Sequence, residues 1–553
     1  MRAISLATLF PLLLFCFSIP AVGRVIDGRP SANRPVLPQP ISPEGQTGFS
    51  LPPAPQVVAP DMPADNLRIL LRAVKFEGNT AITDMQLQAI AKPYLNHAVS
   101  LADLEALRLA FSQYYVDKGY INSGAVLPEQ AFKDGVIHFQ IIEGELSRIQ
   151  VSGTERLNPD YIANRLRLGA KSPLNFNKLQ ERFQMLLADP LIERMNGQLK
   201  PGSQPGESIF DVKVVRKRPY QVSLTIDNHR PPSVGAEQAT LAGWVRNLTG
   251  WGDEIDWNMI YSEGSLAGGG GLTIPLNRYD TRFHFDFSLA QTTVIEEAFA
   301  GLDVKSRYNA YNYTLSQPLY QSLQHNLGFS STLSIRQNRS SFNLGLGDNE
   351  DGWSQSTAIR NAFDYTYQDE QQAVALRSTL SVGIHAFGAT WWGNKKPDSD
   401  FVSWLNQLQY VRQIMDNGSQ LLFNGTVQWA NDELLPLERF ALGGSGGVRG
   451  YRENELVRDQ GYLLSLEFHY PLLNGDRFPG KLSLAPFMDY GSAWNYNESA
   501  STLYSIGTGL IWKPFQRVQA EIYYAYPLNA PLPQKEKSLQ DAGIHFSVSL
   551  SAF

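Results

Sequence analysis

The sequence predicts a mostly β protein whose C-terminal part is a transmembrane antiparallel β-barrel, preceded by two small domains that mix helices and strands. Three observations support this prediction. All ten tryptophans and nineteen of the 24 tyrosines lie within residues 219–553. Short segments that alternate apolar and polar side chains recur there, separated by Gly, Asn and Asp turns. Between residues 67 and 217, one pattern of strand and helix signals occurs twice.

Residues 1–23 have the features of a secretory signal peptide. Arg2 precedes an apolar stretch over residues 4–19, and small residues follow up to Gly23, after which we expect cleavage. A permanent N-terminal membrane anchor is the alternative. Cys16 is the one cysteine of the chain and lies within this stretch, so we expect neither disulfides nor cysteine-bound metals in the exported protein.

Residues 24–66 are predicted to be a proline-rich linker. Ten prolines fall between Pro30 and Pro63. Proline removes the backbone donors that helices and sheet interiors need, so we expect this segment to run extended or disordered.

Residues 67–146 and 147–217 are predicted to be two copies of one β-α-α-β-β domain. Val74-x-Phe76-x-Gly78 recurs 75 residues later as Ile149-x-Val151-x-Gly153, and each copy is an alternating strand that ends at a glycine. Helix starts are indicated by Thr83 with Gln86, by Ser100, and by Asn158 with Pro159. The closing strands are expected at about 120–127, 136–142, 194–200 and 208–215.

Residues 219–553 favour an outer-membrane barrel over a soluble β-sandwich. The apolar residues Leu464, Leu466, Phe468 and Tyr470 alternate with Ser465, Glu467 and His469, and Ile544, Phe546, Val548 and Leu550 alternate with His545, Ser547 and Ser549. In a barrel the apolar set faces lipid, the polar set lines the lumen, and aromatic residues gather at the two interfaces. In a sandwich the same apolar set would fill a core. The signal peptide and the C-terminal Phe553 favour the barrel.

A glycine-rich segment, Leu442-Gly443-Gly444-Ser445-Gly446-Gly447-Val448-Arg449-Gly450-Tyr451, lies in a gap of about residues 432–460 between alternating segments. A loop of this length is usually functional or disordered, and glycines allow it to pack closely against a wall. A mobile surface loop with a hydrated arginine is the alternative. A phosphate-binding loop does not fit, because no helix follows.

A second motif, Phe487-x-Asp489-x-Gly491, places three residues on one face of a strand. Leu484 and Met488 lie on the opposite face and suit lipid, so we expect Asp489 to point into the lumen. An aspartate in the lumen and an arginine on a loop of the same barrel make a possible ion pair.

The other features of the sequence give no support for nucleic-acid binding, a metal site or an enzyme. A net charge of −6 does not favour a nucleic-acid binder. The eight histidines show no metal-ligand spacing, and no Gly-x-Ser-x-Gly nucleophile motif occurs. The four glycines 268–271 are expected to form a turn. We therefore expect no enzyme, no metal site and no cofactor.

The order of these segments resembles the two-partner secretion transporters, the TpsB family that exports haemolysins and filamentous adhesins. The repeats resemble polypeptide-transport-associated (POTRA) domains. Val448-Arg449-Gly450-Tyr451 matches the loop motif of that superfamily, and Phe487, Asp489 and Gly491 match its strand motif. The resemblance covers nearly the whole mature chain. It implies a barrel of about 16 strands, an inward-folded loop whose Arg449 meets Asp489, and Phe553 as part of the C-terminal assembly signal.

The resemblance also implies a function. The chain would export a specific partner protein of the adhesin or haemolysin type, without ATP, from the periplasm to the cell surface. Implied partners are an unfolded protein with an N-terminal secretion domain, the outer-membrane lipid and the barrel-assembly machinery. A barrel-assembly factor is the alternative, but such factors usually carry more repeats. An uptake porin would lack the repeats, and an enzyme in a barrel would need a nucleophile and a base.

Many family members carry an N-terminal helix that plugs the pore. Residues 24–29 are too few for such a helix before the prolines begin. We therefore expect the loop around residues 432–460 to close the pore.

Overall fold

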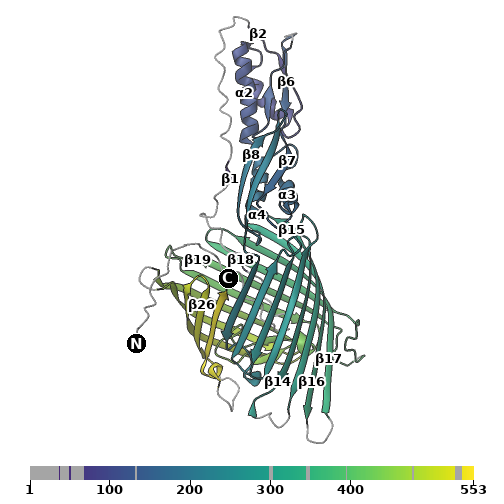
Figure 1. Ribbon diagram of the computed structural model, residues 1–553, viewed down its shortest axis with the longest axis vertical. Coiled ribbons are helices and arrows are strands. Elements are labelled where there is room, and N and C mark those ends of the chain that lie inside the picture. Colours follow the sequence, from purple (N-terminus) through teal and green to yellow (C-terminus); the bar gives the residue numbers. More distant parts are fainter. Residues whose placement is uncertain are drawn as a thin grey trace, which may run out of the picture.

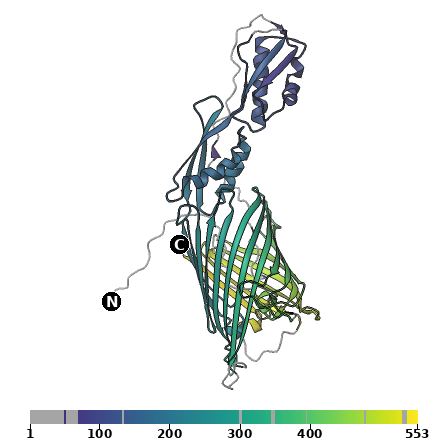
Figure 2. The same cartoon turned by 90° about the vertical axis from the view of Figure 1, so that its right-hand side faces the viewer.

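The computed structural model describes residues 37, 49–50, 68–130, 134–297, 303–343, 349–393, 395–475, 479–529 and 538–552. Two small domains stand one above the other at one end of a large barrel (Figure 1), and the view after a quarter turn shows the same column (Figure 2). The predicted signal peptide, most of the linker and Phe553 lie outside the described residues. Within the described ranges, no helix combines the length and the apolar character needed to cross a membrane.

The first domain is built from β2 (Ile69–Leu70), β3 (Ala73–Glu77), α1 (Asp84–Ala91), η3 (Lys92–Tyr94), β4 (Ala98–Val99), α2 (Leu101–Asp117), β5 (Gly124–Val126) and β6 (Val136–Ile142). Its main sheet has the order β3-β6-β5. Thr83 and Ser100 form the capping boxes that start α1 and α2. Leu104, Leu107 and Phe111 of α2 pack with Phe139 in the core.

The strand expected at 120–127 is shorter than predicted. After α2 the chain makes a tight turn, in which the backbone N–H of Tyr120 donates to the Tyr115 carbonyl at 2.9 Å and that of Ser123 to Tyr120 at 3.0 Å. Those groups are used in the turn, so they cannot pair with β6 and the strand begins only at Gly124.

The second domain repeats the same order with β7 (Glu145–Ser152), α3 (Pro159–Leu166), η4 (Arg167–Gly169), α4 (Phe176–Leu187), β8 (Ile192–Pro201) and β9 (Glu207–Arg216). Asn158 caps α3 by accepting from the Asp160 N–H at 2.9 Å. The sheet order is β1-β8-β9-β7, where β1 (Phe49–Ser50) comes from the linker and pairs in parallel with β8. Part of the linker is therefore a short strand on the edge of this sheet.

Within the described ranges, sixteen strands form a closed antiparallel barrel, in which β10 at the start pairs with β27 at the end. They are β10 (Tyr220–Asp227), β11 (Gln238–Arg246), β12 (Glu254–Ser262), β13 (Ser265–Pro275), β14 (Arg282–Thr293), β15 (Lys305–Gln321), β16 (His325–Asn343), β17 (Asn349–Gln368), β18 (Gln372–Gly383), β19 (Val402–Gln413), β20 (Gln420–Ala430), β23 (Gln460–Asn474), β24 (Lys481–Trp494), β25 (Ser501–Phe515), β26 (Val518–Pro527) and β27 (Ile544–Ala552). β10 follows the second domain directly. We therefore call the end of the barrel at which β10 begins the domain end.

The side chains of the wall alternate as the barrel prediction requires. Met488 is 55% exposed on the outside of β24, whereas its neighbour Asp489 is 2% exposed and faces inward. Exposed aromatic residues lie near both rims: Tyr220, Tyr279, Tyr320 and Phe515 near the domain end, and Tyr261, Trp404, Trp429 and Tyr526 near the far end. This is the pattern of a barrel that spans a bilayer.

The glycine run 268–271 does not form the turn that the sequence analysis expected. All four residues lie inside β13 and pair with β12 on one side and β14 on the other. A Cβ atom on Gly271 would lie 2.5 Å from a carboxylate oxygen of Asp256. Glycine in a strand can mark such a close approach rather than a turn.

Candidate functional site

The segment between β20 and β23, residues 431–459, enters the lumen of the barrel. It contains η6 (Pro436–Glu438) and a small hairpin of β21 (Phe440–Leu442) and β22 (Leu456–Arg458). Val448 and Tyr451 are buried in one apolar cluster with Leu463, Ala493 and Leu503 of the wall. The loop is therefore packed against the wall, and the alternative of a mobile loop with a hydrated arginine is wrong.

Arg449 lies at the centre of this contact and faces Asp489 on β24. Its Nε donates to Asp489 Oδ2 at 2.8 Å and its Nη2 to Oδ1 at 2.9 Å. The backbone N–H of Arg449 also donates to Oδ2 at 3.0 Å. Arg449 is 7% exposed and Asp489 2%. A planar guanidinium suits this two-point bond to a carboxylate, so the geometry fixes both position and orientation.

Arg449 has further partners that the sequence analysis did not assign to it. Its Nη1 forms an ion pair with Glu467 of β23, and its Nη2 donates to Ser465 Oγ at 3.3 Å. The guanidinium carbon lies 3.4 Å from the ring centre of Phe487 and 5.0 Å from that of Tyr523. The aromatic ring of the motif residue Phe487 thus forms a cation–π contact with Arg449. Strand alternation had already placed Glu467 in the lumen, but no local signal linked it to the arginine.

The motif glycines lie where side chains would clash. Gly450 has a φ of +91°, and its N–H donates to His545 Nε2 at 3.2 Å. A Cβ atom on Gly491 would lie 2.6 Å from Leu442 of the loop. The hydroxyl of Tyr451 lies 3.1 Å from the Tyr504 carbonyl oxygen and also bonds to Asn529. All the predicted motif residues therefore contribute to the contact between loop and wall.

The base of the loop is held on a different part of the wall. Glu438 of η6 is 1% exposed. Its carboxylate accepts from Arg360 of β17 at 2.7 and 2.8 Å and from Ser356 Oγ at 2.8 Å. Arg336 of β16 lies 3.8 Å from it. The sequence analysis missed this cluster. Arg336 and Arg360 stand at inward positions of their strands, but nothing local shows that a glutamate in a later loop reaches them.

A third contact holds the loop to the far end of the barrel. Arg452 forms ion pairs at 2.6 Å with Asp541 of η7 (Leu539–Ala542) and with Glu296, which follows β14. The N–H of Glu453 donates to Gln540 at 2.9 Å. In the part of the chain that the structure describes, no group of three or more His, Cys, Asp or Glu could hold a metal ion.

Comparison with known protein families decides the class of this barrel. Residues 206–512 match the family described as haemolysin secretion/activation protein ShlB/FhaC/HecB, and residues 69–144 match the ShlB-type POTRA domain. The chain belongs to the haemolysin secretion/activation family. The predicted family and the predicted fold, a barrel of about 16 strands after POTRA domains, are thereby confirmed.

Known members of this secretion family resemble the chain over most of its length. The outer membrane transporter CdiB of Dickeya dadantii (strain 3937) is 22% identical over 460 residues, which cover 80% of this chain and 79% of that protein. The heme/hemopexin transporter protein HuxB of Haemophilus influenzae (strain 86-028NP) is 22% identical over 493 residues and covers 83% of each chain. The solved structure of CdiB from Escherichia coli has a TM-score of 0.67 at 20% identity and covers 91% of this chain and 94% of that one.

The family places the protein in the outer membrane, with the POTRA domains in the periplasm. The domain end of the barrel is therefore the periplasmic end, and the far end faces the cell surface. The loop that carries Arg449 connects β20 and β23 at the surface end and folds back into the lumen.

Proposed function

We propose that this transporter exports a specific unfolded partner protein from the periplasm to the cell surface through the barrel lumen. One observation carries the proposal. The loop that lies in the lumen is held by side chains such as Arg449, Glu438 and Arg452, whereas the wall is held by its own ladder from β10 to β27. The loop can leave without breaking the backbone bonds that keep the barrel in lipid.

The POTRA domains would receive the partner on a sheet edge. An extended chain can pair with such an edge through main-chain hydrogen bonds. β8 already accepts one extended segment, because Phe49 and Ser50 pair with Gly197 and Gln198. We propose that the partner carries an N-terminal secretion domain and belongs to the adhesin or haemolysin type. Folding of the partner outside the cell would remove unfolded chain from the pore and drive export without ATP.

The roles of the individual segments follow from this proposal. Residues 1–23 direct export and residues 24–66 are the linker. Residues 67–146 and 147–217 bind the partner, and residues 219–553 form the pore. Within the pore, Val448, Arg449, Gly450 and Tyr451 hold the closed loop against Phe487, Asp489 and Gly491. Phe553 would serve as the signal for the barrel-assembly machinery, and no catalytic residue is required.

The proposal is tested by secretion in cells. The full chain is produced together with the protein encoded by the neighbouring reading frame, and secreted partner is measured per transporter in the outer membrane. We expect secretion only when the transporter is present. If its loss instead lowers the amounts of unrelated outer-membrane barrels while the partner is still secreted, the chain is a barrel-assembly factor and the proposal is wrong.

A further inference from the structure

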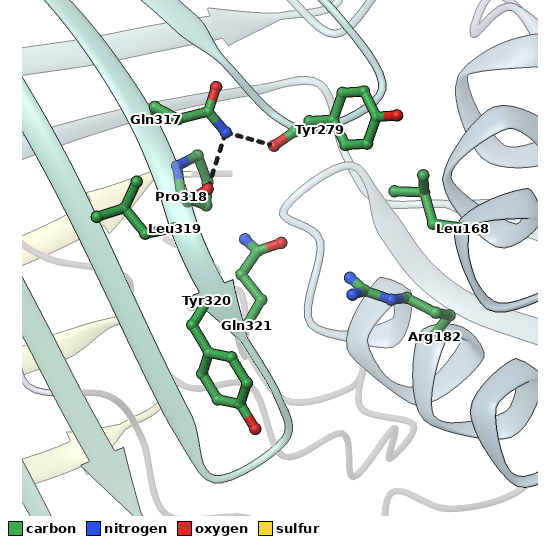
Figure 3. A pocket seen from close by; sticks show the side chains of 8 residues that line it. All are labelled: Leu168, Arg182, Tyr279, Gln317, Pro318, Leu319, Tyr320 and Gln321. Carbon is green, nitrogen blue, oxygen red and sulfur yellow. Dashed lines mark hydrogen bonds between the residues drawn. The ribbon is translucent and has the colours of Figure 1, made fainter.

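A cavity of about 360 Å³ lies between the second POTRA domain and the periplasmic rim of the barrel. Its lining includes Leu168 and Arg182 from the domain and Tyr279, Gln317, Leu319 and Tyr320 from the barrel. Figure 3 shows these side chains around one space, with β15 on one side and α4 on the other. The cavity is thus formed jointly by the second POTRA domain and the barrel. None of its lining residues belongs to the loop motif or to the strand motif.

Arg182 supplies a positive charge to this cavity. Its side chain is half-buried, and its guanidinium points across the space toward Gln321 (Figure 3). Among the residues that the structure describes, none makes a hydrogen bond or an ion pair with it. A Cβ atom on Gly169 would lie 2.8 Å from Cγ of Arg182. The stem of the arginine therefore packs closely over a glycine, which directs the charged head into the cavity.

The acidic side chain that follows Tyr279 on the rim is bound by other arginines. Asp280, next to Tyr279, is already paired with Arg165 at 3.2 Å and with Arg282 at 2.9 Å. Arg278 adds a further guanidinium, which donates to the hydroxyl of Tyr279 at 3.1 Å. Arg182 therefore keeps its charge in the cavity beside the amide groups of Gln317 and Gln321, a combination that suits an oxyanion.

The outer wall beside the cavity faces the lipid. Leu319 is 55% exposed, Tyr320 57% and Leu276 53%. Exposed tyrosines at a barrel rim lie at the level of the lipid headgroups, and basic pockets at that level bind anionic headgroups. The space therefore opens where a headgroup would enter it, with apolar surface next to it for the acyl chains.

We propose that this cavity binds the phosphate of a phospholipid headgroup from the periplasmic leaflet. Arg182 donates hydrogen bonds to the phosphate oxygens, and the amide of Gln321 contributes a further donor. The acyl chains lie along Leu319 on the outside of β15. The bound lipid links α4 of the second POTRA domain to the membrane.

The test uses the full chain in detergent and counts bound lipid by native mass spectrometry. The probes are dioleoylphosphatidylglycerol, dioleoylglycerol, which has the same acyl chains without the phosphate, and inorganic phosphate, which has no acyl chains. We expect retention of the phospholipid alone, and about tenfold weaker retention in Arg182→Ala, as for the loss of a charged hydrogen bond. Arg167→Ala is the matched control, because Arg167 is exposed and does not line the cavity.

Three outcomes overturn the proposal. The first is equal retention of phosphatidylglycerol by Arg182→Ala and the unmodified protein. The second is equal binding of dioleoylglycerol, since the phosphate would then be irrelevant. The third is displacement of the lipid by millimolar inorganic phosphate, which would mean that the site takes free phosphate. Heat-dependent gel mobility shows that each barrel is folded. Arg182→Lys keeps the charge but not the planar fork, so we expect intermediate retention.

Discussion

Arg449 binds two carboxylates, so replacing the arginine and replacing one of the carboxylates should have different effects. Asp489 binds it through two parallel hydrogen bonds, and Glu467 binds its third nitrogen. Glu467 also accepts from Tyr523 at 2.9 Å and contacts His469. Loss of the arginine therefore leaves two buried acids, whereas loss of Asp489 leaves an arginine that still has one acidic partner.

We expect Arg449→Ala to lower secretion more than Asp489→Ala. Breaking a buried ion pair from one side costs on the order of 3–5 kcal/mol, and the cost falls on the docking of the loop because the barrel ladder does not use these side chains. The double variant should do no worse than Arg449→Ala, because one stranded acid is gone. Arg449→Lys should fail in part, since lysine cannot form the two-point bond.

The measurement for these variants is secreted partner per transporter inserted in the membrane. Wild-type secretion by both single alanine variants would show that the pair has no functional role. Simple addition of the two effects in the double variant would show that the residues act independently.

Glu438 anchors the base of the loop, so its change should loosen the loop while Arg449 remains bound. Glu438→Gln removes the charge that faces Arg360 and Arg336, and leaves two buried guanidinium groups without an acid. We expect a higher rate of brief channel openings in planar bilayers, because the loop would be held mainly at its tip and surface end. Glu433→Gln, five residues earlier in the same loop, is the control. Equal behaviour of the two variants would contradict an anchoring role.

At the scale of elements, we propose that the loop between β20 and β23 closes the pore. Deletion of residues 443–451 removes Arg449 and the buried Val448 and Tyr451. We expect a higher conductance in planar bilayers, because the tip would no longer occupy its part of the lumen. An unchanged conductance would mean that another segment closes the pore, such as residues 24–66.

Glu143 joins three elements of the first POTRA domain. It accepts from the N–H groups of Thr80 and Ala81 at 2.7 and 2.8 Å, and from the hydroxyl of Tyr115 at 3.0 Å. Burial alone would raise the pKa of Glu143, but these hydrogen bonds together with one from the Thr80 hydroxyl outweigh it, so the pKa lies below its ordinary value of 4.5.

Because the pKa of Glu143 is lowered in the folded domain, its ionised carboxylate stabilises the fold fully at a pH above the ordinary pKa. This stabilisation is lost as the pH falls through the lowered pKa of the folded domain. We therefore expect the amides of Thr80 and Ala81 to lose protection from hydrogen exchange below about pH 4.5, after correction for the intrinsic exchange rate. In Glu143→Gln their protection should be low at all pH values. Protection that stays independent of pH in the unmodified protein would refute this role.

At the scale of the whole molecule, the described strands of the POTRA domains and of the barrel belong to different sheets. No POTRA strand belongs to the barrel ladder among the described residues. The contacts between the parts include a hydrogen bond from the Asn158 N–H to the Gly250 carbonyl at 2.8 Å and an ion pair of Arg165 with Asp280. We expect deletion of residues 67–217 to abolish secretion and to leave a heat-modifiable barrel in the membrane. Normal secretion by this deletion would show that the proposed export mechanism is wrong.

Much of the architecture could be predicted because it depends on neighbours along the chain. The capping residues Ser100 and Asn158 start their helices as expected. The alternation around Asp489 identified the inward face of β24. The glycine run 268–271 misled the prediction, because glycine is common both in turns and where side chains of adjacent strands come close.

The class of fold, the repeated domain, the inward and outward faces of the strands and the two motifs could be predicted from the sequence alone. Three contacts could be found only in the folded molecule: Glu467 shares Arg449 with Asp489, Glu438 reaches Arg360, and Arg182 faces a cavity at the rim. The two groups differ in how far apart along the chain the interacting residues lie. Helix caps and strand alternation arise within a few residues, whereas these contacts depend on the register of all sixteen paired strands and on the path of one loop through the lumen.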